Sequence, residues 1–310
     1  MSEPLISVVM PVYNAAATLA ATIASVQAQD CAAFELIAID DGSRDDSLAL
    51  LDRLAAADPR IRVVPRANAG VSAARNLGVS LASAPLVAFL DADDLWHPHK
   101  LSRHLALHRA HPDLVGSYAR IAFIAADATA IEGARTHSQL GPDPLTLLSV
   151  LGENPVCTAS NFVVSRSAFD ACDGFDEQLG FAEDQELVAR MIARGGDIRG
   201  VDAVLTGYRL SVMGLSMDLD RMHAGWREMV DRHLPDPDAT ARLEALYYRY
   251  LARRALRSGG RAGLALRYVA QGLARDPAAF LGQPRRSLPT IAAALAAPLL
   301  PTRLRLRLFA

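Results

Sequence analysis

Three carboxylates stand close together in the stretch FLDADDLWHP, residues 89–98, directly after an apolar run. Asp91, Asp93 and Asp94 carry like charges, which repel one another when they are crowded at the end of a strand. Hard divalent cations such as Mg²⁺ and Mn²⁺ bind carboxylate oxygens and bridge them to the phosphates of a substrate. A cation between the carboxylates would make the cluster tolerable, so the stretch predicts a metal site that serves a phosphate-bearing ligand.

Two other ways of holding a nucleotide are missing from the sequence. The turn after the first apolar run reads PVYNAAAT and lacks the glycines of a dinucleotide-binding fold. The chain has no G-x-x-x-x-G-K-[ST] motif, and its single lysine is Lys100, so a P-loop is also excluded. A cation held by carboxylates is therefore the predicted means of neutralising phosphates.

The first hundred residues alternate between short apolar runs and helix-like stretches. The predicted strands cover residues 6–10, 34–39, 61–64 and 86–90, and the predicted helices cover residues 16–28, 45–57 and 71–80. Continuous apolar runs are typical of parallel strands that are covered by helices on both faces of a sheet. The pattern predicts an open, mostly parallel α/β fold, and in such folds ligands bind at the carboxyl ends of the strands.

The later parts of the chain follow a looser pattern. Strands are predicted in LVGSYARIAFIA and TASNFVVSR, and a helix is predicted in AEDQELVARMIARGG. Residues 239–275 predict two helices that are broken at SGGR. We expect a catalytic domain at residues 1–235, with a nucleotide-binding half at 1–113 and an acceptor half at 114–235, followed by a basic helical region at 236–310.

Five stretches, in this order and spacing, resemble the inverting family 2 glycosyltransferases with the A-type fold. They are SVVMPVYNAAATLAATIASVQAQ, FELIAIDDGSRDDS, NAGVSAARNLGVSLA, FLDADDLWHPHKL and GFDEQLGFAEDQELVAR, and together they lie within residues 5–215. The resemblance implies a metal-dependent transfer of a sugar from a nucleoside-diphosphate sugar, expected to be a UDP-sugar. It also implies a glycan or lipid-linked saccharide as the acceptor, in the synthesis of a cell-envelope polysaccharide.

The same resemblance assigns residues to the nucleotide-sugar site. The family's base and ribose contacts fall here on Pro11, Val12, Tyr13 and Asp41, its phosphate and sugar contacts on Arg75, Asp91, Ala92 and Asp93. Asp93 is expected to be the principal metal ligand, with Asp91 beside it. From the residues alone, a role as a turn cap is favoured for Asp40. For Asp94, a helix cap or a hydrogen-bond acceptor behind the metal ligands is favoured over a role as a ligand.

On the acceptor side, the resemblance makes Asp184 of AEDQE the general base that deprotonates the acceptor hydroxyl. Asp184 falls at the start of a predicted helix, where the helix dipole should favour its ionised form. Glu183, Trp96, Tyr208 and Arg209 are weaker candidates for the acceptor side. Glu183 could instead be structural, and Trp96 could pack in the core rather than stack on a sugar.

Histidines follow closely on Asp91–Asp93, which we call the DxD stretch, at positions 97, 99, 104, 108 and 111. By number they could form a metal cluster, but we favour solvated or capping histidines on a polar helix that follows Pro98. His223 is a further candidate metal ligand. The cysteines, Cys31, Cys157 and Cys172, are far apart and form no CxxC pair, so we expect neither a disulfide nor a zinc site, and a reducing, cytoplasmic location.

Charge is distributed unevenly between the two ends of the chain. Residues 241–310 hold 13 Arg against 2 acidic residues, a net charge of +11, so residues 1–240 carry a net charge of −13 within the total of −2. The basic tail could be a helical hairpin packed on the catalytic domain, a peripheral contact with an anionic membrane, or a site for an anionic polymer. Nucleic acid is not expected, because no aromatic platform accompanies the arginines.

No membrane-crossing or secretory segment is predicted. The longest apolar stretch, residues 288–300, is short and contains two prolines, and the first residues lack a basic leader. Two alternative functions remain open. A sugar nucleotidyltransferase would need a Gly-rich basic loop after the first strand, and a catalytically silent nucleotide-sugar-binding homologue would not need Asp91, Asp93 and Asp184.

Overall fold

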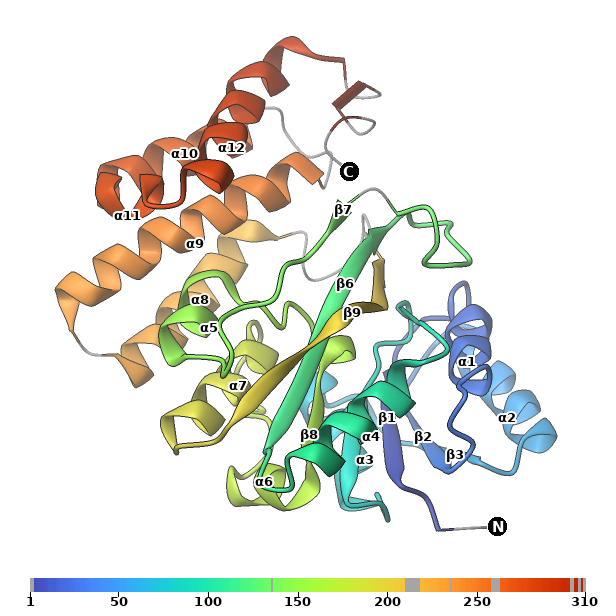
Figure 1. The fold of residues 1–310 in the computed structure, drawn as a ribbon. Coiled ribbons are helices and arrows are strands. Elements are labelled where there is room, and N and C mark those ends of the chain that lie inside the picture. The colour runs from blue at the N-terminus through green and yellow to red at the C-terminus, as the bar shows by residue number, and fades with distance from the viewer. Residues whose placement is uncertain are drawn as a thin grey trace. The chain divides into compact units, whose positions relative to one another are not determined.

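The structure is a computed structural model of the 310-residue chain, and it describes residues 3–134, 136–209, 218–234, 236–257, 263–301, 304, 305 and 308. The chain divides into two compact units (Figure 1). The first consists of Met1–Thr146 and Pro155–Arg209, and the second of Leu147–Asn154 and Leu210–Ala310. This division differs from the predicted boundary after residue 235, because the second unit begins at Leu210 and also takes in Leu147–Asn154, both of which the sequence assigned to the acceptor half.

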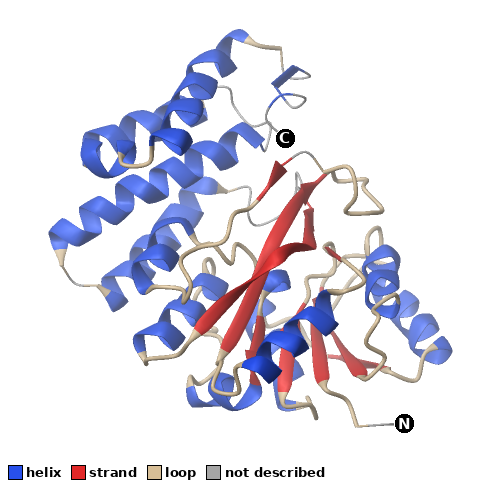
Figure 2. Cartoon of the chain, in the orientation of Figure 1, coloured by secondary structure: helices blue, strands red, loops and turns tan. Residues whose placement is uncertain are grey.

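The first unit is built on one sheet, whose strands appear in red in Figure 2. The strand order is β3-β2-β1-β4-β8-β6-β9-β5, with β7 paired to β6. Strands β1 to β4 pair in parallel, as do β6 and β9, whereas β8 lies antiparallel between β4 and β6. The strands are β1 (Ile6–Val12), β2 (Phe34–Asp40), β3 (Ile61–Pro65), β4 (Leu86–Phe89), β5 (Leu95–Trp96), β6 (Gly116–Ile124), β7 (Thr136–His137), β8 (Val163–Ser165) and β9 (Ile198–Arg209).

Helices cover both faces of this sheet, so the predicted mostly parallel α/β fold is confirmed. The helices of the first unit are α1 (Leu19–Gln27), α2 (Ser47–Ala57), α3 (Val71–Ser80), α4 (Lys100–Ala110), α6 (Arg166–Ala171) and α7 (Glu183–Ala193). Every residue of β1 is buried, as expected for a central parallel strand that has helices on both sides. The seven predicted strands and helices of the first hundred residues all form, with ends that shift by at most a few residues.

Two glycines fix the position of α3 against the sheet. Gly70, directly before α3, has φ 94°, a backbone conformation that other residues rarely adopt. A Cβ atom at Gly78 would lie 2.4 Å from Cγ1 of Val9 in β1, so the absence of a side chain allows α3 to pack close to that strand. Helix α3 carries Arg75, and its close packing therefore sets where the arginine can reach.

One predicted strand is only half correct. TASNFVVSR begins with the single turn η1 (Ala159–Asn161), and only its later residues form β8. Thr158 caps η1, because its side chain accepts a hydrogen bond from the Ser160 N–H. Thr, Ser and Asn in succession compete with strand pairing through such local hydrogen bonds, which is the physical reason for the turn.

The second unit is helical. It contains α5 (Leu147–Glu153), α8 (Leu219–His233), α9 (Pro237–Arg257), α10 (Leu264–Arg275), α11 (Pro277–Leu281), α12 (Pro284–Ala296) and the turn η3 (Ala297–Leu299). The two helices predicted between residues 239 and 275 are confirmed as α9 and α10, while the predicted break at SGGR lies outside the described residues. No helix in the described ranges has the length and apolar character needed to span a membrane.

Stacked aromatic rings form the centre of this second unit. Trp226 of α8 and Tyr247 of α9 lie 4.7 Å apart between ring centroids, with planes 13° from parallel. His223 stacks on Trp226 and pairs with Glu244, with 3.0 Å between Nε2 and Oε1. His223 is therefore part of a helix–helix contact inside this unit, and a role as a metal ligand, which the sequence offered only as a minor alternative, has no support in these contacts.

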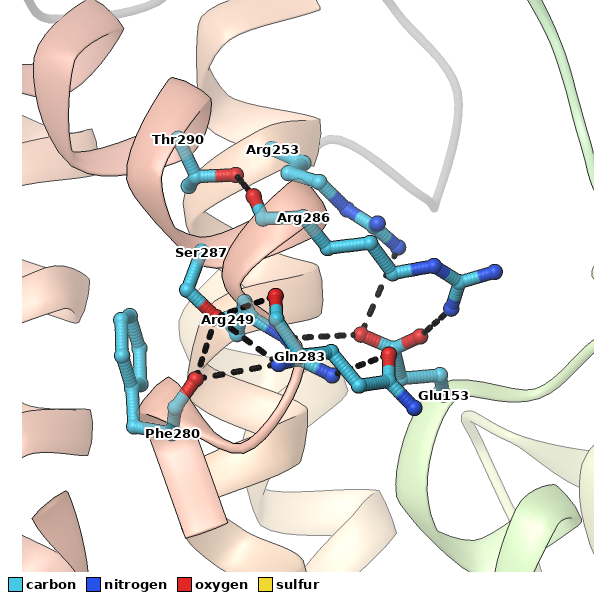
Figure 3. A network of polar contacts seen from close by, with 8 residues as sticks. All are labelled: Glu153, Arg249, Arg253, Phe280, Gln283, Arg286, Ser287 and Thr290. Atoms are coloured by element: carbon cyan, nitrogen blue, oxygen red, sulfur yellow. Dashed lines mark hydrogen bonds and ion pairs between the residues drawn. The ribbon is translucent and has the colours of Figure 1, made fainter. Parts of the chain in front are cut away.

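A polar network ties α5, α9 and α12 together around Glu153 (Figure 3). The buried Arg249 donates from Nε to Glu153 at 2.9 Å and from its other nitrogens to Gln283 and Ser287. Arg253 and Arg286 form ion pairs with the same carboxylate. Burial alone would raise the pKa of Glu153, but the three arginines hold the pKa below its ordinary value.

Replacing this carboxylate should destabilise the second unit strongly. In Glu153→Gln, three guanidinium groups lose their common counter-charge, and we expect the free energy of unfolding to fall by about 3–5 kcal/mol. Urea unfolding followed by tryptophan fluorescence in a Trp96→Phe background reports on Trp226 alone, since the chain has 2 Trp. The matched control is Glu228→Gln, which breaks an exposed pair with Arg232 and should cost at most about 1 kcal/mol. Equal losses in both variants would contradict a central role for Glu153.

Candidate active site

The predicted site residues gather at the carboxyl ends of adjacent strands. Strands β2, β1 and β4 are neighbours in the sheet, so the chain segments that follow them emerge side by side. Asp41 follows β2, Tyr13 follows β1 and Asp91 follows β4 within two residues. The structure thus brings together at one edge the residues that the sequence placed after three separate strands.

The end of β1 presents one exposed ring beside buried residues. Pro11 and Val12 are buried, whereas Tyr13 is 49% exposed. Ala92, in the carboxylate stretch, is held by α1, because its carbonyl oxygen accepts hydrogen bonds from Thr18 at 2.9 Å and Thr22 at 3.0 Å. The exposed face of Tyr13 is the part of this segment that a planar ligand could contact.

Asp41 organises the loop that leads into α3. Its two carboxylate oxygens accept hydrogen bonds from the N–H groups of Ala69 at 3.0 Å and Gly70 at 2.9 Å. Arg66 forms an ion pair with the same carboxylate, with 3.3 Å between Nε and Oδ1. Asp41 therefore closes the turn that precedes α3, and any hydrogen bond to a ligand would be additional to these contacts.

Arg75 connects the two acidic clusters of the sequence. The guanidinium group of this buried α3 residue donates to Asp91 Oδ1 at 2.6 Å and to Glu183 Oε1 at 2.8 Å. Its Nε atom has no hydrogen-bond partner within the described part of the chain. Burial would lower the pKa of Arg75, but the two carboxylates outweigh it and raise the pKa above its ordinary value. A permanently charged group thus joins the DxD stretch to the AEDQE helix.

The turn η1 and the residue before it also position the DxD stretch. The sequence did not predict these contacts. The Asp91 N–H donates to Ser160 Oγ at 2.9 Å, and Thr158 Oγ1 donates to the Asp91 carboxylate at 3.3 Å. The indole N–H of Trp96 donates to the Ser160 carbonyl oxygen at 2.9 Å. The signal for these positioning residues was present in TASN, a run of residues that favour turns and caps.

Crowding and burial affect the remaining carboxylates of the stretch. Burial, together with the charge of Asp91, raises the pKa of Asp93 to about 6. Burial also raises the pKa of Asp94 well above its ordinary value, and this residue accepts a hydrogen bond from the Arg209 N–H at 2.9 Å. The hydrogen bond from Arg209 supports a structural role for Asp94. Asp93 is the carboxyl group whose ionised form a cation would stabilise.

Asp184 differs from the sequence-based expectation in its electrostatics. It lies in the first turn of α7 as predicted, and its Oδ1 accepts a hydrogen bond from the Gln185 N–H at 2.7 Å. Burial, then the neighbouring charge of Glu183, raises the pKa of Asp184 to about 7 despite the opposing effect of Arg75. Burial and the like charge of Glu183 act against the ionisation that the position at the helix start would favour. A carboxylate with this pKa is well suited to accept a proton near neutral pH.

The two neighbouring glutamates have other partners. Glu183 is bound to Arg75, and Glu186 accepts hydrogen bonds from Arg190 at 2.9 and 2.6 Å. These contacts occupy Glu183 and Glu186 in structural ion pairs.

Besides Glu183, two further acceptor-side candidates are buried and make structural contacts. The ring of Trp96 is 3% exposed and packs in the core, so core packing is the correct interpretation. Arg209 is buried, and its guanidinium group donates to the carbonyl oxygens of Asp93 at 2.6 Å and Ala126 at 2.8 Å. Tyr208 packs edge-on against Phe123, with 6.1 Å between ring centroids. Arg209 therefore fixes the backbone of the DxD stretch instead of facing open solvent.

The structure also differs from the prediction for one histidine of α4. His104 of α4 is fully buried, and its Nδ1 lies 2.7 Å from Ser117 Oγ. Lys100 is buried beside it and donates to Thr206 Oγ1 at 3.1 Å. Burial lowers the pKa of Lys100 to about 7 and that of His104 well below its ordinary value. The interpretation as a solvated or capping residue is therefore wrong for His104, which belongs to a buried polar cluster.

The carboxylates at this edge of the sheet are few for a metal site made of protein ligands alone. Within the described ranges, no group of three or more His, Cys, Asp or Glu residues could hold a metal ion by itself. Mg²⁺ and Mn²⁺, however, are commonly bound by one or two carboxylates together with substrate phosphates. Asp93 and Asp91 provide such carboxylates, and a cation there would relieve the repulsion that raises the pKa of Asp93. The residues present therefore fit a cation shared with a substrate.

This fold also occurs in structures solved with a bound nucleotide sugar. S. aureus TarS 1–349 in complex with UDP-GlcNAc matches with a TM-score of 0.59 and 18% identity, over 97% of this chain and 88% of that one. The mannosyltransferase PcManGT from Pyrobaculum calidifontis, in complex with GDP-Man and Mn²⁺, matches with a TM-score of 0.55 and 20% identity, over 99% of this chain and 79% of its own. The fold and its carboxylate-lined edge thus define an A-type glycosyltransferase architecture.

The chain belongs to glycosyl transferase family 2, whose family model matches residues 7–172. Succinoglycan biosynthesis protein ExoU of Rhizobium meliloti is 31% identical over 254 residues, 76% of this chain and 72% of ExoU. Uncharacterized protein y4gI of Sinorhizobium fredii is 35% identical over 66% of this chain but only 22% of its own length. WfgD of Escherichia coli, a UDP-Glc:alpha-D-GlcNAc-diphosphoundecaprenol beta-1,3-glucosyltransferase, is 38% identical over 34% of this chain and 42% of its own length. The chain therefore spans less than half the length of two of these relatives.

Proposed function

We propose that the protein transfers a sugar from a nucleoside-diphosphate sugar to the hydroxyl group of a saccharide acceptor, with inversion at the anomeric carbon. The observation that carries this proposal is the bridge of Arg75 between Asp91 and Glu183. Arg75 links the carboxylates that would hold a cation for the diphosphate to the helix that carries the candidate base. We therefore assign both to one site. Family membership supports the same reaction class.

On the donor side, we assign the nucleotide to the strand ends. Tyr13 would contact the base or ribose with its exposed ring, and Asp41 would bind the base. Arg75 would offer positive charge near the diphosphate, because its guanidinium is buried and always ionised. A bound Mg²⁺ or Mn²⁺ ion, held by Asp93 and Asp91, would stabilise negative charge on the departing diphosphate. A UDP-sugar is the proposed donor.

On the acceptor side, we assign the base to Asp184. The acceptor oxygen attacks the anomeric carbon, while the bond from that carbon to the diphosphate oxygen breaks and its electron pair leaves with the nucleoside diphosphate. Asp184 takes the proton of the attacking hydroxyl group. Its pKa of about 7 supports this role, because a general base works best when its pKa lies near the working pH.

We propose a glycan or a lipid-linked saccharide as the acceptor, at the cytoplasmic face of a membrane. ExoU is named for succinoglycan biosynthesis, and the name of WfgD specifies a diphosphoundecaprenol-linked acceptor, which supports this class.

The proposal is tested by ligand-dependent stability and turnover. UDP-, GDP- and dTDP-sugars are added to the full chain with and without Mn²⁺, and thermal unfolding is recorded. A cognate UDP-sugar at a hundredfold over its dissociation constant should stabilise the protein by about 2.7 kcal/mol. Sugar 1-phosphates serve as the control, since they lack the nucleoside and should have little effect.

The outcomes separate the proposed function from its alternatives. Release of nucleoside diphosphate in the presence of a saccharide acceptor supports a glycosyltransferase. Stabilisation without any turnover or donor hydrolysis would identify a silent nucleotide-sugar-binding homologue. Consumption of a nucleoside triphosphate with a sugar 1-phosphate would identify a nucleotidyltransferase and overturn the proposal.

A further inference from the structure

Helix α12 and the turn η3 present leucine side chains to solvent. Leu288, Leu295 and Leu299 are 59%, 56% and 85% exposed. These positions follow one another by seven and four residues, a spacing that places side chains along one face of a helix. The outer face of α12 is therefore an apolar stripe, defined here as these three leucines.

The inner face of the same helix is polar or made of small residues. Ser287, Thr290 and Ala294 are buried, and Ala297 of η3 is buried next to them. A helix on the surface of a protein in water normally buries its apolar face and exposes its polar face. In α12 this arrangement is reversed. Such a reversal is favourable only if something apolar covers the outer face.

The polar network of Figure 3 fixes the helix in this orientation. Ser287 Oγ accepts a hydrogen bond from Arg249 at 3.0 Å, and Arg286 is paired with Glu153. Arg249 also binds the Phe280 carbonyl oxygen at 3.0 Å and Gln283 at 3.1 Å, just before α12 begins. Rotating the leucines inward would break these buried contacts, so the stripe is a fixed feature of the second unit.

Charge indicates what covers the stripe. Residues 277–310 contain five Arg and no Asp or Glu, a net charge of +5. Arg285 is exposed on α12 itself. Of the nine large hydrophobic residues exposed in the described part of the chain, six lie between residues 281 and 308. A surface that is both apolar and basic matches the boundary of an anionic bilayer, whereas a second copy of this acid-free segment would bring like charges together.

We propose that α12 and η3 form a membrane-docking surface, with the leucine stripe in the headgroup region and the exposed Arg285 against anionic lipid phosphates. In this arrangement the helix lies in the plane of the membrane surface. The proposal uses no residue of the candidate active site. It therefore stands or falls independently of the proposed reaction.

The test is sedimentation of the full chain with vesicles, without any nucleotide. One set of vesicles contains phosphatidylcholine alone, and the other also contains phosphatidylglycerol. The protein should bind the second set at low salt and much less at high salt, where the charges are screened. The variant Leu288→Gln/Leu295→Gln/Leu299→Gln should bind at least about tenfold more weakly, because interfacial binding scales with the apolar area inserted.

A matched control and a local reporter make the test specific. Leu148→Gln changes a leucine of α5 that is 57% exposed outside the stripe, and it should leave vesicle binding unchanged. Leu295→Trp adds a tryptophan at an exposed position, whereas the two native tryptophans are already buried. The emission of the new tryptophan should therefore shift to the blue when phosphatidylglycerol vesicles cover it.

Three results would overturn the proposal. The first is full-length protein that ignores phosphatidylglycerol vesicles at low salt. The second is an equal loss of binding in the Leu148→Gln control. The third is a stripe variant that keeps vesicle binding but changes the oligomeric state in light scattering, which would assign the leucine stripe to self-association.

Discussion

Asp184→Asn should lower turnover by about 10²–10⁴-fold, the range typical of a lost general base, while the donor still binds. Asparagine keeps the size of the side chain and can accept the hydrogen bond from the Gln185 N–H, but it cannot take a proton at neutral pH. The nucleotide contacts that we assign lie on other strand ends, so the dissociation constant of UDP should change little. A fall in kcat without a change in binding is expected when an interaction acts only in the transition state.

The pH dependence of turnover in the wild-type protein is a second test of the role of Asp184. Because burial and Glu183 raise the pKa of Asp184 to about 7, the base should be largely protonated at pH 6 and largely ionised at pH 8. Turnover at saturating substrate should therefore rise with pH through about 7 and then level off. A flat profile between pH 5 and pH 8 would mean that the base has an ordinary carboxyl pKa, and our assignment would be wrong.

Two neighbouring variants serve as controls for the assignment. Glu186→Gln removes a charge that pairs with Arg190, and it should affect stability more than turnover. Glu183→Gln removes a partner of Arg75 and also a charge that raises the pKa of Asp184, so the pH profile should shift toward lower pH. If Asp184→Asn stays active and either glutamine variant does not, the base has been misassigned by one or two positions.

Asp93→Asn should abolish the Mn²⁺-dependent part of nucleoside-diphosphate binding. Asp93 forms no ion pair with the arginines that the structure describes, and burial together with Asp91 raises its pKa to about 6. A cation would stabilise its ionised form, and a divalent ion can contribute several kcal/mol to charge stabilisation, so we expect Mn²⁺-dependent affinity for UDP to fall on the order of 100-fold. Calorimetric titration of UDP with and without Mn²⁺ measures the difference directly.

The same carboxyl group predicts how metal dependence changes with pH. A metal competes with the proton for a carboxylate, so lowering the pH through about 6 should weaken Mn²⁺-dependent binding in the wild type. Asp94→Asn is the matched control, because Asp94 is buried against the backbone of Arg209 and should not be needed for the metal. Unchanged Mn²⁺ dependence in Asp93→Asn, or its loss in Asp94→Asn alone, would refute the assignment of the metal to Asp93.

The sequence by itself determined the architecture of the first unit. Runs such as residues 6–10 and 34–39 are apolar without interruption, and such runs bury well only as strands covered on both faces. The polar residues at the ends of these runs had to emerge at one edge of the sheet, because parallel strands share a direction. For this reason the sequence alone predicted that Asp41 and Asp91 lie at the same edge of the sheet.

Local pattern also explains where prediction failed. The TASN stretch of Thr158 to Asn161 looked like part of a strand, but its side chains bond to nearby backbone and form the turn η1. His104 lies on a helix of polar composition, so its burial could not be seen from the helix alone. It is buried because α4 packs on the sheet and Ser117 of β6 offers it a hydrogen bond.

Only the tertiary structure decided the electrostatics of the site. Arg75 and Glu183 are 108 positions apart in the chain, and nothing local indicated that one guanidinium would join Glu183 to Asp91. The helix start at Asp184 predicted an ionised carboxylate, whereas burial and an adjacent charge raise its pKa to about 7. Secondary structure follows from the periodicity of neighbouring residues, but a pKa depends on the solvent and the charges that folding brings from distant parts of the chain.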